Sequence, residues 1–238
     1  LAIVTSQSIT FFVIVFFVHK QAWFKLSNFF GKFDKYYFKK LLGFTAMSLT
    51  SMCVAPTSQM FVRGYLASHT SWDVAGCWQG MQKISDSYLM IVYAALGTYF
   101  LPKLANLQDK KEIRREVING YKLIMPFVIG SALIIYLGRD FIIHLLFAKS
   151  FAPMRDMFFW QLTGDCFKMA AYIPGYLMVA KGRTRLFIIN EVGAGLLFLL
   201  SSIYFINYFG AIGAVQAFCL IYVVDFIFLS IVMKDSYE

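Results

Sequence analysis

The chain has 238 residues, of which 59% are hydrophobic and only 15% are charged, with a formal net charge of +9. Soluble domains carry roughly 25% charged residues, so the composition excludes an ordinary soluble domain and indicates a protein in contact with lipid. The positive residues are divided among loops between apolar runs, which argues against nucleic-acid binding and favours membrane lipids as partners.

Long apolar runs predict helices that cross a membrane. A helix needs ~20 residues to cross a hydrocarbon core ~30 Å thick, and its backbone amides must be paired within the segment. The runs are continuous rather than alternating, so we expect an all-α membrane protein, a polytopic helix bundle. About seven transmembrane helices are predicted, at 1–18, 42–64, 75–101, 121–138, 157–180, 186–206 and 211–233.

The first 41 residues are expected to hold one helix and a linker. The chain opens inside the run 1–18, with no charged stretch before it, so we expect a longer protein whose N-terminal part is missing. The segment 19–41 mixes lysines with aromatic rings, as interfacial segments do. It is interpreted either as a linker between two halves or as a loop that adheres to the membrane.

Two further segments are predicted to lie at the membrane surface. Residues 109–122 keep Ile113, Val117 and Tyr121 at helical spacing, which predicts a short amphipathic helix lying flat. Residues 139–156 are too short an apolar run to cross, and we expect them to be interfacial or re-entrant, with Pro153 ending them.

Lysine and arginine sort by side along the predicted topology. Most of them lie in 19–41, 102–122 and 181–185, and the alternate connections hold few. Short loops rich in these residues stay cytoplasmic. The first span is therefore expected to run from outside to inside, and the C-terminus is expected in the cytoplasm.

Two predicted spans carry polar residues on one face. At about 100° per residue, the group in 75–101 covers about a third of the helix circumference, and the group in 157–180 falls within about 60°. In 75–101 the group is Gln79, Gln82, Lys83 and Asp86, and in 157–180 it is Gln161, Asp165, Lys168 and Tyr172. The order of charges is reversed between the two, which would allow Lys83 to meet Asp165 and Asp86 to meet Lys168.

These groups have two interpretations, because charge inside a bilayer faces either a partner or water. One is a set of ion pairs that fix helix register. The other is a hydrated cavity in which Gln and Tyr bind sugar hydroxyls and Lys binds phosphate. Glu191 and Asp225 also lie within spans, and we expect structural pairing or an ion pathway there. Asp86, Asp165 and Asp225 are the candidate coupling carboxylates.

No catalytic signature is present. The four cysteines form no CxxC pair and the three histidines have no metal-ligand spacing, so we expect free thiols, no metal site and no cofactor. The usual nucleophile, zinc and phosphate-loop motifs are missing. The sequence therefore predicts that the protein is not an enzyme, with a structural membrane subunit or a membrane-embedded transferase as the outlying alternative.

Two blocks carry a resemblance to a known family. WQGMQKISD (78–86) and WQLTGDCFK (160–168), within 75–233, resemble the Wzx-type polysaccharide flippases of the multidrug/oligosaccharidyl-lipid/polysaccharide superfamily. The nearest group among them is that of the lipid III flippases of enterobacterial common antigen synthesis. The resemblance implies twelve helices in two six-helix lobes. Residues 1–18 would then be the last helix of the first lobe, 19–41 the cytoplasmic linker, and 42–238 the second lobe.

The resemblance also implies a function. Such proteins move an undecaprenyl-diphosphate-linked oligosaccharide, an O-antigen or enterobacterial common antigen repeat unit, from the cytoplasmic to the periplasmic leaflet of the bacterial inner membrane. Alternating access of the two lobes would move it, with Lys83 and Lys168 offsetting the diphosphate charge. Polymerase and chain-length proteins of the pathway are implied as further partners. The alternative is a cation-coupled drug or metabolite exporter of the same superfamily.

Overall fold

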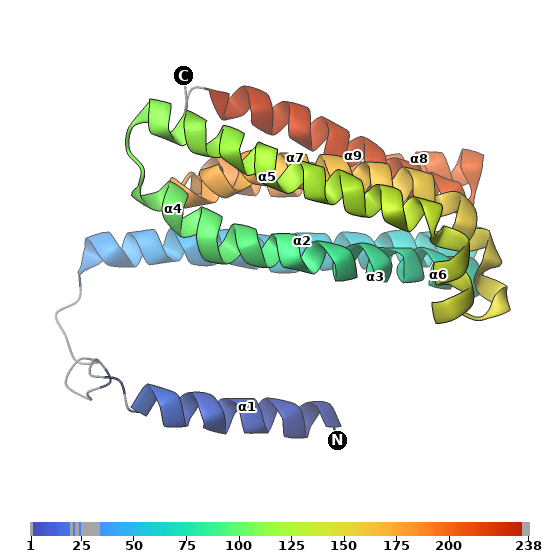
Figure 1. Ribbon diagram of the computed structural model, residues 1–238, viewed down its shortest axis with the longest axis horizontal. Helices are drawn as coiled ribbons and strands as arrows, with labels where there is room; N and C mark the ends of the chain where they lie inside the picture. Colours follow the sequence, from blue (N-terminus) through green and yellow to red (C-terminus); the bar gives the residue numbers. More distant parts are fainter. Residues whose placement is uncertain (1, 20, 22–23, 25–33, 235–238) are drawn as a thin grey trace. The chain divides into compact units, whose positions relative to one another are not determined.

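The computed structural model describes residues 2–19, 21, 24 and 34–234, and every regular element within them is helical (Figure 1). Contacts divide the chain into two compact units, residues 1–41 and 42–238. The elements, in chain order, are α1 (Ala2–His19), α2 (Lys35–His69), α3 (Trp72–Ala95), η2 (Leu96–Phe100), α4 (Leu101–Asn106), α5 (Lys110–Leu137), α6 (Arg139–Leu146), η3 (Lys149–Met157), α7 (Phe158–Ala180), α8 (Thr184–Phe209) and α9 (Ala211–Val232).

The helices have the lengths and compositions of membrane spans. Five segments in the described part of the chain are long and apolar enough to cross: α2, the continuous α3–η2–α4 run, α5, α8 and α9. The apolar part of α1, Val4–His19, is shorter. Helix α7 has 23 residues but includes Asp165 and Lys168. The predicted class, a polytopic all-α membrane bundle, is therefore confirmed.

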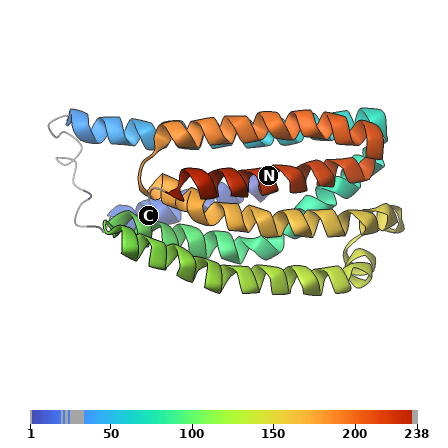
Figure 2. The ribbon, with the colours of Figure 1, turned by 90° about the horizontal axis from the view of Figure 1, so that it is seen from above.

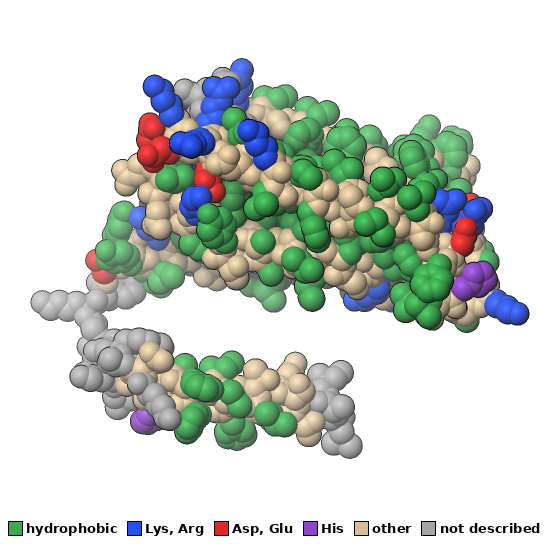
Figure 3. All heavy atoms as spheres, viewed as in Figure 1, with side chains coloured by type: hydrophobic (Ala, Val, Ile, Leu, Met, Phe, Trp, Pro, Cys, Tyr) green, Lys and Arg blue, Asp and Glu red, His purple; other side chains and the backbone are tan. Residues whose placement is uncertain are grey.

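Helix α7 lies at the centre of the 42–238 unit. Figure 2 shows α8, α9, α7 and α5 side by side in that order. More than half of α7 is buried, including Phe158, Met169 and Leu177. Around it, side chains from α3, α5 and α9 form two apolar clusters. The outside of the unit is a broad hydrophobic belt, and Lys and Arg gather mainly at its two ends (Figure 3).

Three boundaries differ from the sequence predictions. Residues 109–122 do not form a separate flat helix, because α5 runs unbroken from Lys110 to Leu137. Ile113 and Val117 continue the buried face of the span, so nothing in the periodicity ends the helix. Pro153 does not end its segment either, since its φ suits the 3₁₀ helix η3 that passes through it.

Helix α2 also begins earlier than the predicted span 42–64. Helix α2 begins at Lys35, so 35–41 belong to a helix, and most of 19–34 lies outside the described residues.

Within 42–238, helix α2 approaches α8 closely at Gly43. A Cβ added at Gly43 would lie 2.8 Å from Oγ1 of Thr184 on α8.

A wide helical turn precedes Pro102. Over η2 the backbone forms a π-helix, in which the Leu101 N–H donates to the Leu96 carbonyl five residues back. Proline cannot donate to the turn before it, and a π turn in the preceding residues absorbs that missing bond. The run thus continues into α4, whose Lys103 forms an ion pair of 2.8 Å with Glu116 of α5.

The connection between α8 and α9 depends on two glycines. Gly210 has φ +58°, a conformation that L side chains rarely adopt. At Gly213 an added Cβ would overlap the Phe205 carbonyl. This close approach joins α8 and α9 as a tight hairpin, which fixes Glu191 on one helix relative to Asp225 on the other.

Candidate functional site

A hydrogen-bonded network links α3 to α7 around Asp165, which is fully buried. One carboxylate oxygen accepts from Ser85 Oγ at 2.6 Å and from Tyr88 Oη at 2.9 Å. The Gln161 side-chain amide donates to Ser85 Oγ at 3.1 Å and to the other Asp165 oxygen at 3.3 Å. Gln82 donates to Gln161 at 3.3 Å, so the network spans the interface with neutral donors.

The two polar helices therefore meet, but not through the predicted ion pairs. In the described part of the chain the ion pairs are Lys103–Glu116 and Arg155–Asp140, and neither Lys83–Asp165 nor Asp86–Lys168 forms. The contact face of α3 holds Trp78, Ser85 and Leu89. That face lies about 90° around the helix from the centre of the predicted polar stripe.

The centre of the stripe points out of the 42–238 unit. Gln79, Lys83 and Asp86 are exposed, whereas Gln82 at the edge of the stripe is half-buried and enters the network. The predicted cluster of α3 is thus split, with one residue in the interface and three on the exposed face.

Lys168 is enclosed by aromatic rings. It is 8% exposed. Its Nζ lies 5.5–6.0 Å from the centroids of four rings, which come from three helices: Tyr93, Tyr172, Phe218 and Tyr222. A cation over several ring faces is stabilised by their quadrupoles. The structure therefore joins the predicted pair Lys168 and Tyr172, in a cage rather than in an open chamber.

A mainly apolar cavity with a few polar groups in its lining lies among α2, α7, α8 and α9. Two adjoining hollows of 140 and 480 Å³ share Tyr172, Asn190, Glu191 and Asp225 in their lining. Asp225 is 9% exposed, and its Oδ1 has no hydrogen-bond partner among the described residues. The amide of Asn190 lies beside this carboxyl, and Ser51 lies beside that of Glu191. The cavity therefore brings two carboxyl groups from neighbouring helices to one shared space.

Sequence reasoning missed several of the residues that build this site: Ser85, Tyr88, Phe218 and Tyr222. Ser85 and Tyr88 flank Asp86 in sequence, and a helical wheel places them on the other side of the helix from Lys83. The apolar residues Trp78 and Leu89 mark the buried face, and Ser85 lies about 20° from Trp78 on the same wheel. The sequence pattern did not single out Phe218 and Tyr222, because α9 is apolar nearly throughout.

Outside the spans, one ion pair joins α6 to η3. Arg155 Nε lies 2.7 Å from Asp140 Oδ1, and Nη2 lies 3.4 Å from Oδ2. This guanidinium holds the pKa of the Asp140 carboxyl below its usual value. The pair ties together the two short helices at this end of the bundle.

Comparison with known proteins gives both sequence relatives and a fold. No family model matches the sequence. Two curated proteins described as "Lipid III flippase", from Escherichia coli (strain K12) and Shigella flexneri, are each 40% identical over 187 residues, which is 79% of this chain and 45% of the relative. The chain thus spans less than half the length of these relatives. The crystal structure of the Vibrio cholerae MATE transporter VcmN in the bent form matches with a TM-score of 0.64 at 17% identity, over 84% of this chain and 47% of that one, and it shares the fold.

Proposed function

Because this chain belongs to the Wzx-type polysaccharide flippases, we propose that the whole protein is a lipid-linked oligosaccharide flippase. Its relatives within that family are the lipid III flippases. Its substrate would be an undecaprenyl-diphosphate-linked glycan, and it would act as a carrier rather than an enzyme. The chain would form the C-terminal lobe, in the bacterial inner membrane, with its C-terminus in the cytoplasm. The loops rich in Lys and Arg support that orientation.

The observation that carries the proposal is the exposed charge on α3. At ~1.5 Å per residue, Lys83 and Asp86 lie ~17 and ~21 Å along the helix from Trp72, near the middle of a core ~30 Å thick. Both are exposed on the 42–238 unit. Charge at that depth does not face acyl chains without a cost of ~2.5–3.5 kcal/mol. This face therefore borders water or the rest of the protein.

The polar groups take different roles in this proposal. Lys83 offsets diphosphate charge from the exposed face, and Gln79 beside it offers an amide to sugar hydroxyls. The interface groups Gln82, Gln161 and Asp165 hold α3 against α7 and so set the direction of that face. Lys168 and Tyr172 lie one layer deeper, where a movement of α3 relative to α9 would open or close the ring cage.

A complementation experiment tests the proposal. The full-length protein is expressed in a strain lacking its lipid III flippase, and surface enterobacterial common antigen is measured. Loss of one Lys–phosphate contact of ~1.5–3 kcal/mol should lower the rate of export by roughly 10- to 100-fold for Lys83→Gln. Lys149→Gln, an exposed position in η3, serves as the control. Equal export by both variants at equal expression would refute a role for Lys83 in handling the substrate.

Coupling to an ion gradient is proposed for the cavity carboxyls. Asp225 lines a hollow that it shares with Glu191, and its buried Oδ1 has no partner among the described residues, so this carboxyl can accept a proton or a small cation. Asp225→Asn should make transport in proteoliposomes insensitive to an imposed gradient, whereas Asp109→Asn at the start of α5 should not. Gradient-dependent transport by the Asp225 variant would exclude this carboxyl. Asp86 and Asp165 would then be the groups to test.

A further inference from the structure

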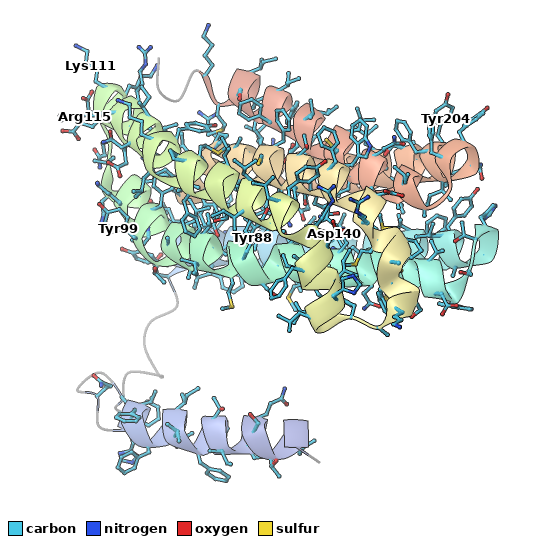
Figure 4. The ribbon with its side chains drawn as sticks, turned by 45° about the vertical axis from the view of Figure 1, so that its right-hand side comes forward. Tyr88, Tyr99, Lys111, Arg115, Asp140 and Tyr204 are labelled. Carbon is cyan, nitrogen blue, oxygen red and sulfur yellow. The ribbon has the colours of Figure 1, made fainter. Side chains whose placement is uncertain are left out.

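One exposed face of α5 carries positive charge that the proposed function does not use. Within the described residues, Lys111, Arg114, Arg115 and Lys122 are all exposed and line a surface hollow of 430 Å³ together with Ile118 and Asn119. Figure 4 shows Lys111 and Arg115 projecting from the first turns of α5, away from the bundle. We call the four basic residues and Ile118 the α5 basic face.

The charges on this helix are segregated by sign. With Lys111 taken as zero, the α5 basic face falls between about −60° and +40°, and the acids Asp109, Glu112 and Glu116 fall between about 100° and 160°. Glu116 is turned inward, where it pairs with Lys103 at 2.8 Å. The exposed basic groups are thus directed away from the acids of their own helix.

The α5 basic face continues directly into the lipid-facing surface. The same angular sector of α5 holds Ile129 and Leu133, which are 52% and 57% exposed. The apolar part after Lys122 is ~22 Å long at ~1.5 Å per residue, shorter than a core of ~30 Å. Lys122 and the turn before it are therefore drawn to head-group depth, with long stems that reach toward the phosphates.

We propose that the α5 basic face is a binding site for an anionic phospholipid of the surrounding membrane. The head-group phosphates would lie between Arg114 and Arg115, which bind phosphate through paired N–H donors, and an acyl chain would follow Ile129 and Leu133. Four cations spread over ~17 Å of helix exceed what one phosphate can contact, so a lipid with two phosphates, or two neighbouring lipids, fits best. This site does not depend on the flippase activity or on the side of the membrane that α5 begins on.

The test uses the purified full-length protein in nanodiscs that contain phosphatidylglycerol, cardiolipin and phosphatidylcholine, with native mass spectrometry counting the lipids retained. We expect the wild-type protein to retain the anionic lipids preferentially. One basic group near an anionic surface contributes roughly a fivefold effect, so Arg114→Gln with Arg115→Gln should lower that retention by at least about tenfold. Arg63→Gln with Lys149→Gln, which removes the same number of charges from exposed positions elsewhere, should leave it near the wild-type level. Equal losses in both variants, or none in the first, would overturn the proposal.

A second measurement needs no substitution in the site. A photoactivatable phosphatidylglycerol is cross-linked to the unmodified protein, and the labelled peptides are mapped. Labels concentrated in 110–137, and reduced by excess cardiolipin but not by inorganic phosphate, would support a lipid site. Labels spread evenly over the apolar belt, or displaced by inorganic phosphate alone, would contradict it.

Discussion

Asp165 is the residue on which the contact between α3 and α7 centres. Its carboxylate accepts from Ser85, Tyr88 and Gln161, and it is fully buried. A buried carboxylate without such donors is costly, and the donors are equally costly to leave without an acceptor. Removal of the Asp165 acceptor is therefore expected to cost the stabilisation from all of these hydrogen bonds together.

Replacing Tyr88 by Phe removes one donor without changing the shape of the side chain. We expect a loss of about 1–2 kcal/mol in the free energy of unfolding, since a buried Asp165 oxygen loses one of its hydrogen-bond donors. Tyr204→Phe is the matched control, because Tyr204 is 58% exposed on α8 and lies at the surface in Figure 4, whereas Tyr88 lies within the bundle. Thermal unfolding in one detergent measures both. A Tyr88 variant as stable as the Tyr204 variant would mean that the bond adds nothing.

Asp165→Ala tests the acceptor itself. It leaves three donors without a partner, so the expected loss is larger, about 3 kcal/mol. Asp165→Asn retains an acceptor oxygen and should recover part of that stability. If Asn were no better than Ala, the network would not be the cause of the loss.

For α3, the sequence predicts part of the site. The residues Gln79, Gln82, Lys83 and Asp86 share one face, and that spacing is visible in the sequence. A helical wheel gives the angles between side chains but not which direction meets a neighbouring helix. The answer depends on where Trp78 and Leu89 find apolar partners, which involves helices far away in the sequence. The ion pairs were therefore wrong, although the meeting of the two helices was anticipated.

At the scale of elements, the α8–α9 hairpin is the most tightly constrained. Gly213→Ala would press a methyl group into the Phe205 backbone, which cannot move as a side-chain tip can. We expect a loss of about 3 kcal/mol in stability, at the upper end of overpacking costs. Gly193→Ala on α8 meets nothing within 4 Å and should be neutral or gain up to about 1 kcal/mol from helix propensity. A shift in melting temperature of the same sign for both would contradict this explanation.

The link between α6 and η3 predicts a pH dependence. Because Arg155 lowers the pKa of Asp140, the pair contributes stability above the ordinary pKa of an aspartate, ~3.9, and loses it as the pH falls through the lowered value. Asp140→Asn should therefore lower the melting temperature slightly at neutral pH and not at all in strong acid. Asp156→Asn, beside Arg155 in sequence, is the control. A difference that persists in strong acid would assign the effect to packing.

Boundaries between elements were harder to predict than the elements themselves. The run of α5 was expected as two pieces, because its charged turns looked like a surface helix. Its buried face in fact continues through Ile113, Val117 and Ile124 without a break. The length of an apolar run predicts where a helix crosses the membrane. Whether the helix continues beyond the membrane depends on which neighbouring helices its charged turns pack against.

At the scale of the whole molecule, exposure on this unit has two meanings, contact with water and contact with lipid. Lys83 and Leu133 are both exposed, but a charged side chain and an apolar one need different surroundings. Contact with water and contact with lipid can be distinguished with single cysteines at positions 83 and 133. The full-length protein used for this lacks Cys53, Cys77, Cys166 and Cys219. A charged maleimide should modify position 83 and leave position 133 unmodified.

The same measurement at Lys168 tests the ring cage. Position 168 should react far more slowly than position 83, because Tyr93, Tyr172, Phe218 and Tyr222 enclose it. Reaction at 168 as fast as at 83 would mean that the cage is open to water in the resting protein. Protection at 83 would remove the physical basis for a hydrated face on α3.

The π turn at Leu96–Phe100 has a consequence for tolerance to deletion. A turn closed by a bond to the fifth residue back holds one residue more than an α-helical turn of the same reach, so this stretch contains a spare residue. Deleting Thr98 would convert the turn to ordinary helix while keeping the downstream phase, and Lys103 would still reach Glu116. One turn earlier or later the helix has no extra residue to lose. A deletion there would rotate Lys103 away from Glu116.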